Sequence, residues 1–289
     1  MKKIDMHIHV SPSPVYKNGK LFVSEPESML RHMDELKIEK AVLMSAGEGP
    51  ADLGSNEGNF AICARYPDRF CWMCNVDERD PETVYDRLAR CKDQGAVGIG
   101  ELMQNLPLDD PFLQAVFTAA QRLEMPVTFH MSPQVGFKYG VVDDPGLPLL
   151  EQTLKAYPDV IFLGHSQPFW IEISGDAPKD PKGRNAWGKG AVTPGGALLR
   201  LFEACPNLFG DLSANSAGRA IMRDENFGLA FLEAYQERLV FATDMLHAEQ
   251  TFPLAAWMEE KMREGKLSEE VCRKIFYENA CCILSAPMV

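Results

Sequence analysis

The stretch Lys3-Ile4-Asp5-Met6-His7-Ile8-His9-Val10 constrains the fold more than any other part of the sequence. It has the composition of a short β-strand, and two histidines lie near its end. Residues i and i+2 of a strand point to the same side, so His7 and His9 can bind one metal ion through their ring nitrogens. Asp5 is predicted to share their face one layer down, where it either orients a ligand or packs the floor beneath it.

Similar β-rich segments recur along the chain and alternate with amphipathic helical patterns. Strands are predicted over residues 3–10, 40–46, 70–77, 96–102, 126–132, 160–166, 208–214 and 239–245. Helices are predicted most clearly over residues 27–36, 81–92, 110–123, 147–156, 195–203, 226–236, 252–263 and 268–284. Regular alternation predicts parallel strands, and eight such units predict closure into a (β/α)8 TIM barrel.

The connections between these segments differ in length. Those after the first, fifth and sixth predicted strands are long, spanning residues 11–25, 133–145 and 167–194, whereas those after helices are short. Long βα loops build the active-site face of a TIM barrel. The stretch 175–190, rich in Gly, Pro and Lys, is predicted to form a lid-like loop, so we expect one domain over residues 1–289.

Composition narrows the classes of function. The chain has 29 Lys and Arg against 41 Asp and Glu, a formal net charge of −12, and its cations form no run that would track a phosphate backbone. Nucleic acid is therefore not an expected partner. The sequence has no apolar segment of membrane-spanning length and no signal peptide pattern, so a cytoplasmic protein acting on a small molecule is expected. Whether it forms a homo-oligomer is left open.

Cysteines are not expected to contribute to chemistry. Eight cysteines are too few for a disulfide scaffold in a chain of this length. Cys71 and Cys74 have a CxxC spacing, but residues three apart on a strand point to opposite faces and do not ligate one ion together. Of the two histidines away from strand ends, His32 is predicted to be solvated on a helix.

Polar residues interrupt the other apolar strands, always near the carboxyl end. Glu101 ends the fourth strand, His130 the fifth, His165 the sixth and Asp244 the eighth. The same parity places Ile99 beside Glu101 inside the barrel and turns Gly98 and Gly100 away. Imidazoles and carboxylates gathered at one end would be costly to bury without a cation. The sequence therefore predicts a metal site at the barrel mouth.

These motifs resemble the amidohydrolase superfamily, especially the amidohydrolase-related branch that contains metal-dependent hydrolases and decarboxylases. The resemblance covers nearly the whole chain and implies that the metal ligands are His7, His9, Glu101, His130, His165 and Asp244. It implies one or two divalent ions, zinc first and manganese second. Many binuclear members carry a carboxylated Lys on strand four, where this chain has Glu101, so the number of ions is left open.

Two reactions fit this resemblance. A hydrolase would use metal-activated water on an amide, lactone or ester, with Asp244 and His165 as the catalytic residues. A decarboxylase would anchor a small unsaturated or aromatic acid on a single ion and protonate it from His165 or Asp244. Hydrolysis is preferred, because the second carboxylate, Glu101, would repel an anionic substrate. An inactive metal-binding barrel is the third alternative.

The remaining expectations concern substrate contacts. The loop after the sixth strand contains Phe169, Trp170, Arg184 and Trp187, an aromatic and cationic mixture suited to a planar or carboxylated substrate. An equal alternative is that Trp170 and Trp187 pin this long loop onto the barrel. Ser213 shares a strand face with Asp211, and either side chain is predicted to bond substrate or a metal ligand. His247 follows Asp244 and is a further candidate for substrate contact.

Overall fold

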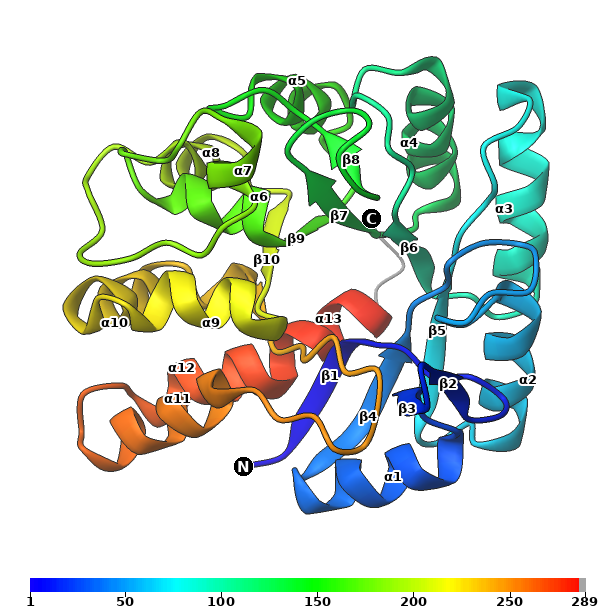
Figure 1. Cartoon of the computed structure of the whole chain (residues 1–289), viewed down its shortest axis with the longest axis horizontal. Helices are drawn as coiled ribbons and strands as arrows, with labels where there is room; N and C mark the ends of the chain where they lie inside the picture. The colour runs from blue at the N-terminus through cyan, green and yellow to red at the C-terminus, as the bar shows by residue number, and fades with distance from the viewer. Residues whose placement is uncertain (286–289) are drawn as a thin grey trace.

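The strands form the predicted barrel in a computed structural model that describes residues 1–285 (Figure 1). All neighbouring barrel strands pair in parallel, in the order β1-β4-β5-β6-β7-β9-β10-β11. Their bounds are β1 (Lys3–Ile8), β4 (Ile38–Leu43), β5 (Phe70–Cys74), β6 (Gly98–Leu102), β7 (Val127–Ser132), β9 (Phe162–His165), β10 (Leu208–Asp211) and β11 (Leu239–Val240). A parallel bridge between Ile8 and Met245 brings the first and last strands together. The eight-stranded TIM barrel predicted from the sequence is confirmed.

Helices surround the barrel (Figure 1). The predicted ones are α1 (Pro26–Glu35), α3 (Val84–Asp93), α4 (Pro111–Leu123), α5 (Pro148–Ala156), α8 (Ala197–Ala204), α10 (Glu225–Ala234), α11 (Pro253–Arg263) and the last segment, α12 (Glu269–Arg273), a π-helix (Lys274–Glu278) and α13 (Asn279–Ser285). Proline is near the start of several of them, and side chains cap others, as when Asp110 accepts from Phe112 N at 2.8 Å.

Two helices were not predicted. Helix α2 (Asn56–Arg65) has no clear apolar stripe, and its Phe60 is 41% exposed. Helix α9 (Ala214–Met222) follows β10 directly and buries small residues, among them Ala217 and Gly218. Helix α2 lacks the periodic apolar pattern that indicates a helix, whereas α9 has such a pattern but was not predicted.

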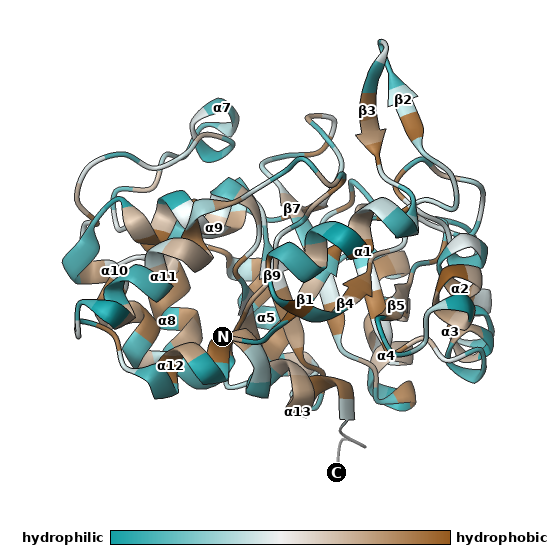
Figure 2. Ribbon diagram, turned by 90° about the horizontal axis from the view of Figure 1, so that it is seen from below, coloured by the Kyte–Doolittle hydropathy of each residue, from teal (hydrophilic) through white to brown (hydrophobic). Residues whose placement is uncertain are grey.

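The long loops contain short elements. Residues 11–25 include a hairpin of β2 (Val15–Lys17) and β3 (Lys20–Val23), which projects on the same side as α7 in Figure 2. Residues 133–145 include β8 (Val141–Val142), and residues 167–194 include α6 (Gln167–Trp170) and α7 (Pro181–Arg184). Short 3-10 turns occupy Pro81–Thr83, Ile171–Ile173 and Gln236–Arg238.

Apolar side chains form two layers. One cluster fills the barrel interior, where Met6, Val42, Leu163 and Val240 pack together and Ile283 of α13 closes the lower end. A larger cluster lies between the strands and the surrounding helices. Cys71 packs against the inner cluster and Cys74 belongs to the outer one, which confirms that this pair points to opposite faces.

The predicted parity is wrong on β6. Ile99 belongs to the outer cluster, while a side chain at Gly98 would meet Met73 inside the barrel. Gly100 likewise faces inward, toward Thr128. The pairing of β6 with β7 shifts register between Ile99 and Leu102, so Glu101 turns inward at the end of a strand whose lower residues alternate the other way.

Strand β1 departs from simple alternation in the same manner. Ile4 and Met6 face the interior, and a register shift between Asp5 and Ile8 precedes the inward-facing His9. Asp5 therefore does not pack the barrel floor.

The prediction for His32 is also wrong, because this residue is buried and its Nε2 lies 2.8 Å from Gln250 O. Within residues 1–285, no helix is both long and apolar enough to cross a membrane.

Candidate metal centre

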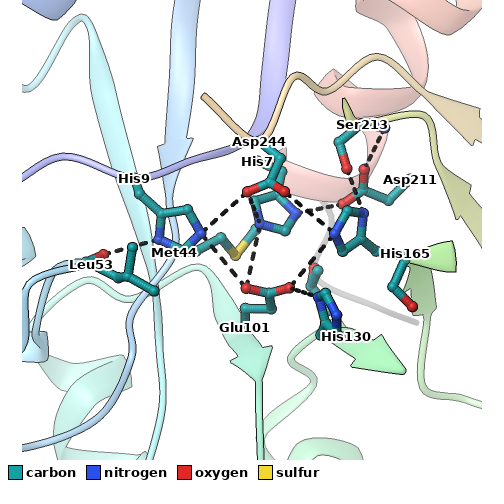
Figure 3. A network of polar contacts seen from close by, with 12 residues as sticks. His7, His9, Met44, Leu53, Glu101, His130, His165, Asp211, Ser213 and Asp244 are labelled. Atoms are coloured by element: carbon teal, nitrogen blue, oxygen red, sulfur yellow. Dashed lines mark hydrogen bonds and ion pairs between the residues drawn. The ribbon is translucent and has the colours of Figure 1, made fainter. Parts of the chain in front are cut away.

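Six side chains converge at the carboxyl ends of the barrel strands (Figure 3). They come from β1, β6, β7, β9 and the segment after β11, and are those of His7, His9, Glu101, His130, His165 and Asp244. Five of the six side chains are largely buried, with 0–13% of their surface exposed, whereas the side chain of Asp244 is 26% exposed. Asp244 therefore lies at the open side of the cluster.

One half of this cluster has the dimensions of a metal site. His7 Nε2 lies 3.7 Å from Glu101 Oε2 and 3.6 Å from Asp244 Oδ1. His9 Nε2 lies 3.6 Å and 3.5 Å from the same two oxygens. A tetrahedral ion bound at about 2.0–2.2 Å holds neighbouring ligand atoms about 3.3–3.6 Å apart. The four imidazole–carboxylate distances are thus close to those between neighbouring ligands of one ion and are too long for good hydrogen bonds, and His7, His9 and Glu101 form a group of potential ligands.

An unpaired polar atom supports the same conclusion. His7 Nε2 is buried and has no hydrogen-bond partner among the described residues. Burying a ring nitrogen without a partner is costly, and a cation between His7 and the two carboxylates removes that cost. The donor set, two imidazoles and two carboxylates, suits zinc or manganese. The residues therefore fit a divalent ion.

The other half of the cluster uses the opposite oxygens of the same carboxylates. His165 Nε2 lies 3.8 Å from Glu101 Oε1 and 3.5 Å from Asp244 Oδ2. His130 Nδ1 donates to Glu101 Oε1 at 3.0 Å. Glu101, His130 and His165 form a second group of potential ligands. This group is less regular than the first, because one of its contacts is an ordinary hydrogen bond.

Outer contacts orient three of the imidazoles. His7 Nδ1 donates to Asp211 Oδ2 at 2.7 Å, and His9 Nδ1 donates to the carbonyl of Leu53 at 2.9 Å. His165 Nδ1 lies 2.6 Å from Ser213 Oγ. In each case Nδ1 is occupied outside the cluster and Nε2 points toward its centre, the arrangement expected of metal-binding histidines. Asp211 and Ser213 thus bond the candidate ligands.

Asp5 supports the backbone that holds these ligands. Its Oδ1 accepts from His7 N at 3.1 Å and from Thr243 N at 3.0 Å, and its Oδ2 accepts from Thr243 Oγ1 at 2.6 Å. Asp5 therefore links the ends of β1 and the segment after β11. Next to Thr243, Asp244 has a φ of +56°, which turns its side chain toward the cluster.

Burial and opposite charges compete within the cluster. Burial works to lower the pKa of His7, but the charges of Asp211, Glu101 and Asp244 outweigh it and hold this pKa well above 6.5. For His9 the same competition raises the pKa to about 9. The pKa of Glu101 is lowered well below 4.5 despite burial, because the imidazoles surround it. Without a metal, His7 and His9 therefore retain protons while Glu101 stays ionised, whereas burial lowers the pKa of His130.

A comparison with known protein families assigns the chain. The family model described as amidohydrolase matches residues 4–284. The chain belongs to the amidohydrolase family. Comparison of this amidohydrolase with curated protein sequences gives no match.

Solved structures show where the amidohydrolase fold recurs. A probable 2-pyrone-4,6-dicarboxylic acid hydrolase from Acinetobacter baumannii is 17% identical, with a TM-score of 0.62 and coverage of 99% of this chain and 100% of that one. A 2,6-dihydroxybenzoate decarboxylase from Rhizobium is 17% identical, with a TM-score of 0.59 and 98% coverage of both chains. A dihydroxybenzoic acid decarboxylase from Polaromonas, solved with manganese, is 17% identical, with a TM-score of 0.61 and coverage of 98% and 96%. At these identities the likeness establishes the fold alone.

Two residues of the amidohydrolase that were predicted to contact substrate are buried in contacts with other parts of the chain. Trp170 is buried, and its Nε1 donates to Asp211 O at 3.2 Å, so it packs α6 against β10. Arg184 is also buried, and its Nη1 donates to the carbonyls of Pro133 and Asp143. Neither side chain is available to a substrate, because each is used to hold a loop. His247 is half-buried in the loop after Asp244, where its N–H donates to Gln250 Oε1 at 3.2 Å.

Tyr139 is a residue at the amidohydrolase centre that sequence reasoning missed. Its ring centroid lies 4.5 Å from that of His130, and the residue is 53% exposed. Gly140 makes this possible, since its φ is +110° and a Cβ there would lie 2.8 Å from His130 Cδ2. Burial and then the charges of Glu101 and Asp244 raise the pKa of Tyr139 to about 12, so its phenol remains a hydrogen-bond donor. The Tyr-Gly pair after a predicted ligand strand is the only sequence signal for this role.

Proposed function

We propose that this chain is a metal-dependent hydrolase that acts on a small carbonyl substrate, an amide, lactone or ester, through activated water. The single observation that carries the proposal is that Glu101 and Asp244 both direct oxygens at the same buried imidazoles. Two carboxylates at one centre favour a neutral reacting group over an anionic one, because a carboxylate bound there would be repelled.

The ion would be held by His7, His9 and Glu101, which form a group of potential ligands, and by Asp244, whose Oδ1 lies 3.6 Å and 3.5 Å from the two imidazoles. Zinc is the preferred ion and manganese the alternative. Such an ion would supply a Lewis acid that lowers the pKa of bound water to about 7 and polarises a carbonyl oxygen. The group of Glu101, His130 and His165 offers a second, weaker position.

Asp244 is the proposed base. Its side chain is the most exposed of the cluster, so it can reach both water and substrate at the barrel mouth. Its Oδ2 lies 3.5 Å from His165 Nε2, so Asp244 would accept a proton from water while the protonated His165 gives its own proton to the leaving group, and Asp244 would then return a proton to His165. Ser213 fixes the His165 ring for this transfer. Tyr139 provides a wall and a phenol donor for a planar substrate.

Decarboxylation of a small unsaturated or aromatic acid is the second candidate. One observation favours it: burial lowers the pKa of His165, but Asp244 and Asp211 outweigh burial and raise it, so this imidazole carries a proton that could replace carbon dioxide. The decarboxylases among the similar structures are consistent with the same chemistry.

One screen separates the two reactions. The zinc-loaded and manganese-loaded enzymes are incubated with a panel of lactones, amides and aromatic acids, and acid release and carbon dioxide are measured in parallel. Hydrolysis predicts acid release without carbon dioxide, lost in Asp244→Asn. Carbon dioxide release that Asp244→Asn also abolishes would replace the hydrolase assignment with the decarboxylase one.

A further inference from the structure

A buried side chain holds the backbone of Glu101. The regular pairing of β6 with β5 stops before this residue. Beyond that point the carbonyl of Glu101 accepts from Asn75 Nδ2 at 2.6 Å, and the carbonyl of Gly100 accepts from Ser45 N at 2.9 Å. Groups at the ends of β4 and β5 therefore fix the segment of β6 from which the Glu101 side chain turns into the barrel mouth.

The other contacts of Asn75 determine which way its amide group points. Asn75 is fully buried, and its Oδ1 accepts from Val76 N at 2.8 Å and from Gln104 Nε2 at 3.0 Å. Because a backbone N–H can only donate, the amide oxygen must lie on the side of Val76, and the NH2 group then faces the carbonyl of Glu101. A side chain with an acceptor on one edge and a donor on the other satisfies both sides at once.

Asn56, the first residue of α2, fixes Asn75 in turn. Its Nδ2 donates to Asn75 O at 2.7 Å, and its Oδ1 accepts from Asn75 N at 3.0 Å. The same oxygen accepts from Ser45 Oγ at 2.7 Å. The amide of Asn56 thus bonds both backbone groups of Asn75, as a neighbouring strand would. A buried network whose members are hydrogen-bonded in this way is rigid, so it holds the Asn75 side chain in one position.

Glu101 is shared by the two halves of the cluster (Figure 3). Its Oε2 lies 3.7 Å from His7 Nε2 and 3.6 Å from His9 Nε2. Its Oε1 lies 3.0 Å from His130 Nδ1 and 3.8 Å from His165 Nε2. The outer contacts of the imidazoles each orient a single ring, whereas a shift of the Glu101 backbone would disturb both halves of the cluster together.

We propose that Asn75 is a positioning residue of the metal centre, whose amide holds Glu101 so that its two oxygens face the two halves of the cluster. The inference rests on the proposed metal site and on neither of the two reactions. Asn75 acts through the backbone of Glu101. Without the Asn75 N–H, the Glu101 carbonyl loses a buried donor, and the segment must shift to recover that hydrogen bond. The carboxylate then leaves the position from which it reaches the imidazoles.

Asn75→Asp tests this assignment, because it keeps the shape of the side chain and removes the N–H that the Glu101 carbonyl accepts. An added negative charge near a cation site would by itself strengthen metal binding, so weaker binding identifies the lost hydrogen bond as the cause. We expect zinc affinity, measured by competition with a chelating indicator, to fall at least about tenfold. Asn75→Ala, which is neutral, should change zinc affinity in the same direction and replaces the Asp variant if that variant does not fold.

A second readout uses the metal-free protein. The chain has six histidines, so their ¹⁵N-imidazole signals are resolvable, and His130→Gln identifies those of His130. The Nδ1 signal of His130 reports its hydrogen bond to Glu101 Oε1. We expect this signal to move in Asn75→Asp, because the carboxylate that accepts the bond is displaced. This measurement needs no bound ion. Wild-type protein that binds no zinc would therefore refute the proposed metal site, while the His130 signal would still decide the role of Asn75.

Asn279→Asp is the matched control. Asn279 of α13 is also buried, and its Nδ2 donates to the carbonyls of Gln236 and Leu239 at 2.7 Å each, away from the metal centre. This variant should lose stability in urea unfolding but keep the zinc affinity and the His130 signal of wild type. An unmoved His130 signal or an unchanged zinc affinity in Asn75→Asp overturns the proposal. An equal loss of zinc affinity in Asn279→Asp also overturns it, because the effect would then be one of general stability.

Discussion

Replacing Asp211 with Asn tests whether contacts outside the cluster hold it ready for a metal. Asp211 Oδ2 accepts from His7 Nδ1 at 2.7 Å, and its Oδ1 accepts from Ser213 N at 2.9 Å. An Asn side chain has nearly the same shape but only one acceptor oxygen. The Asn oxygen can keep one of these two hydrogen bonds, and the Asn NH2 group then faces the N–H donor of the other. The His7 ring loses either its charged partner or its fixed orientation.

The expected loss follows from what that bond does. With Nδ1 held by a carboxylate, the lone pair of His7 Nε2 faces Glu101 and Asp244 and is more basic. Partners of this kind typically change metal affinity 10–100-fold, which corresponds to about 1.4–2.7 kcal/mol. We therefore expect Asp211→Asn to bind zinc 10–100-fold more weakly while remaining folded.

Competition with a chelating zinc indicator measures the affinity, and circular dichroism reports the fold. Asp68→Asn, an exchange of the same type at an exposed residue away from the cluster, serves as the control. Zinc affinity in Asp211→Asn equal to that of the control would refute the reasoning, because His7 would then not depend on its buried partner.

Three further predictions address the surroundings of the site. Ser213→Ala removes the contact to His165 Nδ1, so turnover should fall about tenfold or more with zinc content unchanged; full turnover in a kinetic assay would contradict this. Gly140→Ala forces a Cβ against His130 at a positive φ, so urea unfolding should show a loss of about 1–3 kcal/mol, and an unchanged midpoint would argue against the contact. Burial raises the pKa of Asp143 to about 6, above its unfolded value of 3.8, so its stabilisation is present below pH 3.8 and is lost as the pH rises through 6. Asp143→Asn removes this titration, so its unfolding free energy should rise relative to that of wild type by about 3 kcal/mol between pH 4 and pH 7. A difference between the two proteins that stays constant over this pH range would contradict the shift.

The barrel and the convergence of its polar residues could be predicted from the sequence for one physical reason. A histidine or carboxylate in an apolar strand is costly to bury, so its repeated occurrence at strand ends indicates a compensating ion. The structure brings the side chains of His7, His165 and Asp244 together, as this reasoning predicts. The sequence also placed Asp211 and Ser213 on one face, and each bonds a candidate ligand.

Features that depend on packing could not be predicted in this way. The register shift between Ile99 and Leu102 and the helix containing Phe60 arise from neighbours distant in the chain, and the contact of the Tyr139 ring with His130 depends on the conformation of the loop between them. Arg184 was interpreted as a substrate residue because aromatic and cationic side chains in one long loop suit a planar or carboxylated substrate. Its guanidinium instead bonds loop carbonyls, and nothing in the local pattern of residues distinguishes the two cases.

Elemental analysis tests the central claim most directly. Wild type and His7→Ala are saturated with zinc or manganese, freed of unbound ion by gel filtration and assayed for metal and protein. The account predicts at least one equivalent of metal in wild type and a loss of most of it in His7→Ala, since His7 Nε2 is the buried atom that otherwise has no partner. Wild-type protein that retains no stoichiometric metal, or a His7→Ala variant that retains all of it, would contradict the assignment of the site.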